Sequence, residues 1–206
     1  MPRTPPRRRR TQEERSQETR GRLLRATLDL LIERGYARLT VADIATRAGV
    51  SNGARVHHFP TKEELVVAAN QQTYEQAVAV GTLRSKNAAQ SKNPIRDCFD
   101  DLLSLYFGEF FLGSLDSVVA ARTDKGLARQ LHPIIARYHA VIRAAWTAAL
   151  RDAGYARRDA EAAYDVILST VRGMALTSVR MRVPKPNMRL VSHVDRMLRD
   201  SIPRTR

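Results

Sequence analysis

Residues 39–65 read LTVADIATRAGVSNGARVHHFPTKEEL, a pattern that predicts two short helices joined by a tight turn and followed at once by a third helix. Thr40 suits the N-cap of a short helix, and Gly49 ends that helix because a residue without Cβ takes a positive φ cheaply. Ser51 then caps a second helix over about 52–58. A helix, a glycine-containing turn and a second helix form the arrangement that places its second helix in the major groove of DNA.

Helices flank this motif on both sides. Apolar residues at helical spacing predict a helix over about 18–34, which Gly35 closes. Thr61 and Glu64 form a capping box that starts a long helix reaching about residue 84. The two helices of the motif and the helix before them therefore predict a compact three-helix bundle.

The remaining sequence also has helical periodicity and no convincing strand alternation. Residues 85–93 are polar and predict a loop, while Pro133 should kink or split the helix that contains it. We expect further helices over about 94–107, 110–122, 124–152, 159–181 and 187–202. The sequence therefore predicts an all-α protein of about nine helices.

The segment from Arg22 to Leu65 resembles the N-terminal domain of the TetR family of bacterial transcription regulators. The matching pieces are LLRATLDLLIERGYARLTVADIATRAGVS and GARVHHFPTKEELV. The resemblance implies a domain that binds DNA as a dimer, followed by a divergent helical domain that senses a small molecule. The family usually has an apolar residue where Arg55 stands and a Tyr where Val56 stands.

Composition sets limits on function. The chain has 206 residues, 43% of them hydrophobic, and a net charge of +14, which favours an anionic partner over a merely solubilising surface. Cys98 is the only cysteine, which excludes an intrachain disulfide and a cysteine-based zinc site and fits a reducing compartment. No secretory signal and no run of 18 apolar residues is visible, so we expect a cytoplasmic protein with no membrane partner.

Charge is concentrated at the N-terminus, where residues 1–10 hold five arginines and no acid. We expect residues 1–17 to form a disordered basic arm that lies on DNA phosphates or enters the minor groove. The alternative is a solvated tail. The expected domains are this arm, a DNA-binding domain at 18–78 with its motif at about 40–59, and a regulatory and dimerisation domain at 79–206.

The second helix of the motif is expected to read base edges. Arg55 suits a bidentate pair with guanine and Asn52 a pair with adenine, whereas a salt bridge on the helix surface is the alternative for Arg55. The resemblance implies that His58 and Lys62 contact phosphates or base edges and that Thr40 contacts the DNA backbone. The expected DNA-binding residues are Thr40, Ser51, Asn52, Gly53, Ala54, Arg55, His57, His58 and Lys62.

The pair His57–His58 raises the question of a metal site. Adjacent residues of a helix do not face each other, and no cysteine or carboxylate accompanies the pair at ligand spacing. For His57 the alternative to a DNA contact is packing at the helix end. We therefore expect neither a metal nor a cofactor.

Aromatic residues gather in the C-terminal part, although they make up only 6% of the chain. They are interpreted either as ordinary core or as the lining of a cavity between helices for an apolar or aromatic ligand. The expected pocket residues are Phe99, Leu103, Tyr106, Phe110, Tyr138, Trp146 and Met174.

The last two expected helices combine apolar stripes with small residues (Ala162, Ala163, Ser169, Gly173, Ala175 and Ser178). The resemblance implies that these helices pair with their copies in a second chain, and internal packing is the alternative. A dimer also follows from the DNA argument, because two recognition helices about 34–36 Å apart read a pseudo-palindrome. We therefore predict a homodimeric regulator, a repressor by analogy with the commoner family members, which a small molecule releases from its operator.

Two other functions remain open. A non-specific architectural nucleic-acid binder would also explain the charge of +14. An enzyme is disfavoured, because the sequence contains no G-x-S-x-G signature, no phosphate loop and no metal-ligand set. The acidic residues Asp97, Asp100 and Asp101 are more simply a solvated helix face.

Overall fold

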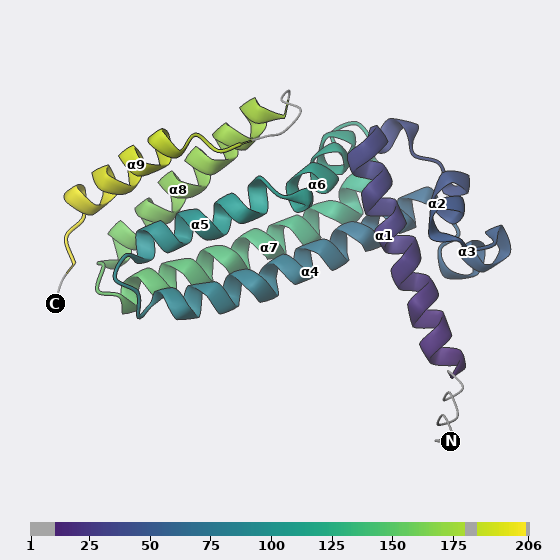
Figure 1. Ribbon diagram of the computed structural model, residues 1–206, viewed down its shortest axis with the longest axis horizontal. Helices are drawn as coiled ribbons and strands as arrows, with labels where there is room; N and C mark the ends of the chain where they lie inside the picture. Colours follow the sequence, from purple (N-terminus) through teal and green to yellow (C-terminus); the bar gives the residue numbers. More distant parts are fainter. Residues whose placement is uncertain (1–10, 180–184, 205–206) are drawn as a thin grey trace, which may run out of the picture. The chain divides into compact units, whose positions relative to one another are not determined.

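A computed structural model of the protein describes residues 11–179 and 185–204, apart from the side chain of Phe110. This part of the chain contains α-helices and no strand, so the all-α prediction is confirmed (Figure 1). The helices are α1 (Gln12–Arg38), α2 (Val41–Ala48), α3 (Asn52–His58), α4 (Lys62–Ala88), α5 (Pro94–Tyr106), α6 (Glu109–Ala120), α7 (Lys125–Asp152), α8 (Arg157–Ser178) and α9 (Met188–Ser201).

The chain divides into two compact units, an N-terminal unit of Met1–Ala69 and a C-terminal unit of Asn70–Arg206. The division lies earlier than the expected boundary at residue 78. Helix α4 begins in the first unit and continues into the second.

In the N-terminal unit, α1, α2 and α3 meet around an apolar core. The Oγ1 of Thr40 accepts a hydrogen bond from the Asp43 amide at 3.1 Å, and Gly49 ends α2 with φ 62°. Gly35, with φ 74°, interrupts α1 where the sequence predicts its end. The buried apolar residues include Leu23, Leu24, Leu30, Leu31, Leu39, Ile44, Ala45 and Phe59.

Helix α1 begins earlier than expected. Thr11 caps it, and its hydroxyl accepts from the Glu14 amide at 3.1 Å while the Glu14 carboxylate accepts from the Thr11 amide at 2.8 Å. The expectation of a disordered arm is therefore wrong for residues 12–17. Residues 1–10, where the rest of that arm was expected, lie outside the described residues.

Two further boundaries differ from expectation in the C-terminal unit. Helix α4 runs on to Ala88 because Ser85 and Ala88 are buried, so only the end of the predicted 85–93 loop remains a loop. Helix α7 passes through Pro133 without a split. Pro133 removes the helical partner of the Arg129 carbonyl, and both residues are exposed, so this carbonyl is open to solvent.

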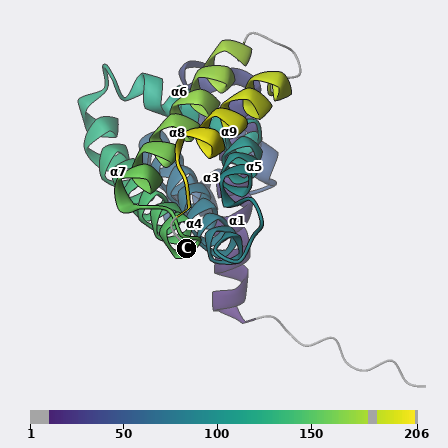
Figure 2. The ribbon, with the colours of Figure 1, turned by 90° about the vertical axis from the view of Figure 1, so that its left-hand side faces the viewer.

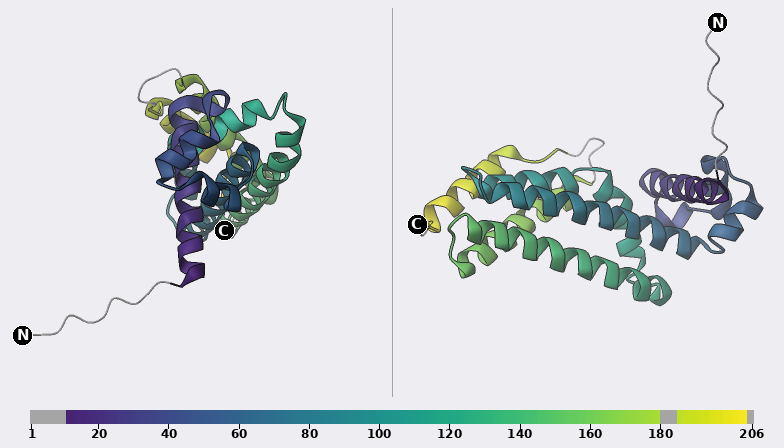
Figure 3. Two further views of the ribbon diagram at one scale, coloured as in Figure 1. Left: turned by 90° about the vertical axis from the view of Figure 1, so that its right-hand side faces the viewer. Right: turned by 90° about the horizontal axis from the view of Figure 1, so that it is seen from below.

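The core of the C-terminal unit surrounds α5, which packs against α6, α7, α8 and α9. Figure 2 shows α9 beside α5 and α8. The parts of α4 and α7 in this unit run side by side (Figure 3). They lie so close that a Cβ added at Gly81 would be 2.7 Å from Cδ1 of Ile142. Among the described residues no single helix is long and apolar enough to cross a bilayer. Helices α5 and α6, which are bent relative to each other, reach that length and apolar composition only when they are taken together.

Candidate functional site

Helix α3 presents one face outward. Asn52, Gly53, Val56 and His57 are exposed, and their spacing places them on one side of the helix. Ser51 starts the helix, because its Oγ accepts a hydrogen bond from the Ala54 amide at 3.2 Å. We call these four exposed residues the α3 outer face. It combines small, polar and apolar side chains.

Gly53 has no structural reason to be glycine. Its φ is not positive, and a Cβ added there would meet nothing within 4 Å. Glycine inside a helix costs about 0.5–1 kcal/mol relative to alanine. The fold itself therefore does not require glycine at this position of the α3 outer face.

Arg55 points inward, away from the centre of the α3 outer face but beside Asn52, and the structure contradicts its expected role in reading guanine. The residue is only 4% exposed. Its Nη1 donates to the carbonyl oxygens of Phe59 at 3.0 Å and Pro60 at 2.7 Å, and its Nη2 donates to Oδ1 of Asn52 at 2.6 Å. A short helix that ends at a proline leaves such carbonyl oxygens without backbone N–H partners. The Arg55 guanidinium donates the missing hydrogen bonds to them. The expected surface salt bridge is equally absent among the described residues.

We expect Arg55→Ala to act on stability, not on base preference. The substitution leaves two carbonyl oxygens without their charged donor and opens a cavity. The free energy of unfolding of the N-terminal unit should fall by about 2 kcal/mol. Urea unfolding measures this, with Val56→Ala on the exposed side of the helix as the control. Unchanged stability together with a changed preference at one base pair would restore the guanine role.

The other expected DNA-binding residues belong to the same N-terminal unit, and two of them already have hydrogen-bond partners. Thr40 is exposed, but its hydroxyl already donates to Oδ2 of Asp43 at 2.7 Å. Nζ of Lys62 donates to the Tyr36 carbonyl at 2.7 Å and lies 4.2 Å from the centre of the Tyr36 ring. Because an ammonium has three donors, Lys62 keeps hydrogen-bonding capacity for a phosphate.

His57 and His58 differ in exposure. His57 is exposed, whereas His58 is half-buried, and burial together with His57 and Arg20 lowers the pKa of His58. The two rings meet edge to face, with centroids 5.5 Å apart. Within the described residues no group of three or more His, Cys, Asp or Glu side chains is placed to hold a metal ion.

A second concentration of polar groups lies inside the C-terminal unit. Nε of Arg172 on α8 donates to the Tyr106 hydroxyl on α5 at 2.8 Å. Nη2 of Arg172 lies 2.8 Å from Nε2 of His139 on α7. The His139 ring contacts Tyr138, and the Tyr138 ring contacts Tyr74 on α4, with centroid distances of 4.9 and 5.2 Å. We call these five residues the Arg172 cluster.

The expected pocket residues divide between this cluster and the surrounding core. Tyr106 and Tyr138 belong to the cluster, and Trp146 lies instead beside Asp101, to which its Nε1 donates at 2.9 Å. The side chain of Phe110 lies outside the described residues. The remaining expected residues, Phe99, Leu103 and Met174, are buried in the core. The sequence interpretation missed Arg172.

A prediction on pH follows from His139. Burial and then Arg172 lower the pKa of His139 from 6.5 to about 4, so the unfolded chain binds a proton there more readily than the folded chain. The stability that His139 contributes is therefore complete above pH 6.5 and is lost as the pH falls towards 4. Urea unfolding measures the free energy of unfolding at pH 7 and at pH 5. The loss between these two pH values should be smaller for His139→Gln than for the wild type. Equal differences would contradict the assignment.

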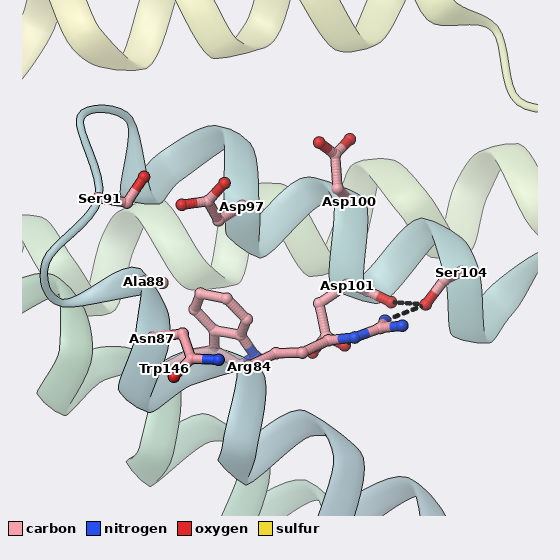
Figure 4. Close-up of a pocket in the computed structure, with 9 residues that line it drawn as sticks. All are labelled: Arg84, Asn87, Ala88, Ser91, Asp97, Asp100, Asp101, Ser104 and Trp146. Carbon is pink, nitrogen blue, oxygen red and sulfur yellow. Dashed lines mark hydrogen bonds and ion pairs between the residues drawn. The ribbon is translucent and has the colours of Figure 1, made fainter.

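A separate pocket of about 480 Å³ lies on the surface of the C-terminal unit among α4, α5 and α7 (Figure 4). Asp101 is 8% exposed and accepts from Trp146 and, at 2.9 Å, from Nη1 of Arg84. The expectation of a solvated acidic face is therefore wrong for Asp101. It is correct for Asp100, which points away from Arg84 and pairs with Arg96 at 2.9 Å. The buried carboxylate connects three helices.

Comparison with known proteins gives matches over both units. The family described as bacterial regulatory proteins, tetR family, matches residues 23–69. The HTH-type transcriptional regulator CymR of Pseudomonas putida is 38% identical over 171 residues, 83% of this chain and 84% of the relative. The HTH-type transcriptional repressor KstR2 of Mycobacterium tuberculosis is 47% identical over 47 residues, 23% of this chain and 24% of the relative. A transcriptional regulator from Rhodococcus sp. Rha1 superimposes with a TM-score of 0.69 at 26% identity, covering 91% of this chain and 99% of that one.

Proposed function

The chain belongs to the TetR family of bacterial transcription regulators, and from this we propose that it is a repressor released from its operator when a small molecule binds the C-terminal unit. Regulators of this family bind operator DNA and act as dimers, and the relatives are not enzymes. The repressor role is supported by the similarity to KstR2, a transcriptional repressor, over 47 residues. We place the protein in the bacterial cytoplasm, where operator DNA lies.

The observation that carries the proposal is the α3 outer face. A short helix with a capped start and an exposed glycine that the fold does not require is suited to enter the major groove. We propose that Asn52, Gly53, Val56 and His57 meet base edges. Thr40, Ser51, Ala54, His58 and Lys62 are proposed to contact the DNA from the flanks.

We propose that the dimer forms through α8 and α9. Ala162, Val166, Ser169, Gly173 and Leu176 are exposed at intervals of four and three residues along α8, the spacing of a helix–helix seam, and we call them the α8 stripe. On α9, Leu190 and Met197 are exposed at a spacing of seven residues. The other small residues named from the sequence, Ala163, Ala175 and Ser178, are buried and pack within the chain.

The mechanism we propose is a population shift. A ligand that binds one arrangement of the C-terminal unit more tightly favours that arrangement. Helix α4 belongs to both units, so a change at its C-terminal part reaches the DNA-binding unit. Release follows when the two α3 helices of the dimer no longer match successive grooves.

A competition assay tests this function. Labelled duplex carrying the preferred site is bound at physiological salt, and unlabelled random duplex is added. Specific binding should exceed non-specific binding by roughly 10³-fold or more. Equal competition by both duplexes would contradict the proposal and favour a non-specific architectural binder. Run-off transcription from a template with the site overlapping the promoter separates a repressor from an activator.

A further inference from the structure

Arg172 brings a positive charge into the interior of the C-terminal unit. It is half-buried on α8 and reaches towards α5 and α7. Its partners in the structure are the Tyr106 hydroxyl and the His139 ring, both of which are uncharged groups at neutral pH, because burial raises the pKa of Tyr106 and lowers that of His139 to about 4.

No carboxylate balances this charge among the described residues. The other interhelical arginines of the unit behave differently: Arg84 pairs with Asp101 at 2.9 Å and Arg143 with Asp165 at 2.7 Å. Arg172 makes no ion pair of this kind in the described part of the chain. A guanidinium has five N–H donors in a planar fork, and the two contacts leave part of that fork unused. Charge-assisted bonds to a carboxylate are stronger than bonds to neutral acceptors.

The surroundings of Arg172 suit a flat apolar body. Tyr106 lies against Phe111, with ring centroids 5.3 Å apart, and Tyr74 and Tyr138 form a second ring pair. A pocket of about 140 Å³ is lined on its inner side by Tyr74, Val78, Ile134 and Tyr138. The exposed residues Gln71, Glu75 and Arg137 complete its lining, and Arg172 is not part of it. This volume compares with a cavity of about 150 Å³ that holds benzene in another protein. Tyr138 therefore belongs both to this pocket and to the ring contacts that lead to Arg172.

We propose that the effector is a small aromatic carboxylate, with its carboxylate bound by Arg172 and its ring among the tyrosines of the cluster. This inference rests on the proposed function, because it names the class of molecule that the C-terminal unit senses. A carboxylate is favoured over a phosphate monoester because one guanidinium matches one negative charge, and among the described residues no second Lys or Arg belongs to the Arg172 cluster. Arg137 lines the neighbouring pocket together with Glu75.

Calorimetric titration of the full-length protein tests the charge of the ligand. The probes are benzoate and phenylacetate, each paired with its neutral amide, and phenyl phosphate. We expect each acid to bind the wild type roughly 10- to 100-fold more tightly than its amide, the effect of one charged hydrogen-bonding partner. Arg172→Gln should bring acid and amide to equal affinity while leaving the amide unchanged. Arg143→Gln, which removes an exposed paired arginine, is the matched control and should keep the preference.

Arg172→Lys is a second variant for the case that Arg172→Gln does not fold. Lysine keeps the positive charge but lacks the planar guanidinium with its five N–H donors. This variant should show a preference for acids between those of the wild type and Arg172→Gln. Equal binding of acid and amide by the wild type, no binding of either acid at millimolar concentration, or tighter binding of phenyl phosphate would each overturn the assignment. DNA affinity is measured on the same preparations. If the protein binds its DNA site specifically but does not bind the acids, only this inference is overturned. If sequence-specific DNA binding is itself absent, the proposed function is overturned.

Discussion

Gly53→Leu is expected to lower the affinity for the preferred duplex by roughly 100-fold or more, without loss of stability. The added side chain projects from the α3 outer face into open space, so nothing in the protein opposes it. Leucine is a better helix former than glycine, and the free energy of unfolding should rise by about 0.5–1 kcal/mol. In the complex, the same side chain would hold the helix away from the base edges. Fluorescence anisotropy and urea unfolding measure the two effects.

Gly21→Leu is the matched control for this substitution. Gly21 is also a helical glycine with no atom within 4 Å of an added Cβ, but it lies on α1. Its replacement should raise stability by a similar amount and change DNA affinity only a few-fold. If Gly53→Leu bound the preferred duplex as tightly as the wild type, α3 would not be the helix that enters the groove.

The second large effect is expected at the α8 stripe. Leu176 is 55% exposed, and Leu176→Arg places a charge in the proposed seam between two chains. We expect the variant to be monomeric by light scattering, with the mass of one 23.2 kDa chain. Its affinity for a pseudo-palindromic duplex should fall by roughly 10²- to 10⁴-fold, because the second half-site is no longer bound in the same complex.

Leu83→Arg is the control for this effect. Leu83 is 61% exposed on α4, outside the proposed dimer helices, and its replacement should leave both mass and affinity unchanged. A wild-type protein that is monomeric at micromolar concentration would contradict the dimer, and a dimeric Leu176→Arg would place the interface elsewhere.

Much of the fold was predictable because its signals are local. The cap at Thr40, the αL glycine at position 49 and the cap at Ser51 define α2 and α3, and each needs only a few neighbouring residues. The periodicity of the later helices predicted their order and most of their bounds. Errors occurred where burial overrode local polarity, as at the end of α4, where Ser85 is buried.

The role of Arg55 was missed because a charged side chain on a recognition helix suggests a DNA contact. A signal was present in the sequence: the family usually has an apolar residue at this position, which indicates an inward-facing site. The separation of four residues from buried Phe59 agrees with that indication.

The Arg172 cluster could not be predicted in the same way. Arg172 meets Tyr106 across 66 positions of sequence and His139 across 33. Such contacts depend on how three helices pack, and helical periodicity carries no information on which polar groups meet in the interior. The sequence did select Tyr106 and Tyr138 as expected pocket residues, and both belong to the Arg172 cluster; that they line a ligand site stays a prediction.

Two copies of α3, related by a two-fold axis, are proposed to read DNA bases, and selection of bound duplexes from a random pool measures this. We expect enrichment of an inverted repeat whose half-sites are centred about 10 base pairs apart, or a whole multiple of that spacing. The Gly53→Leu variant should enrich no such repeat. A pool that stays random, or one that yields a single half-site without a symmetric partner, would show that paired α3 helices do not read the site.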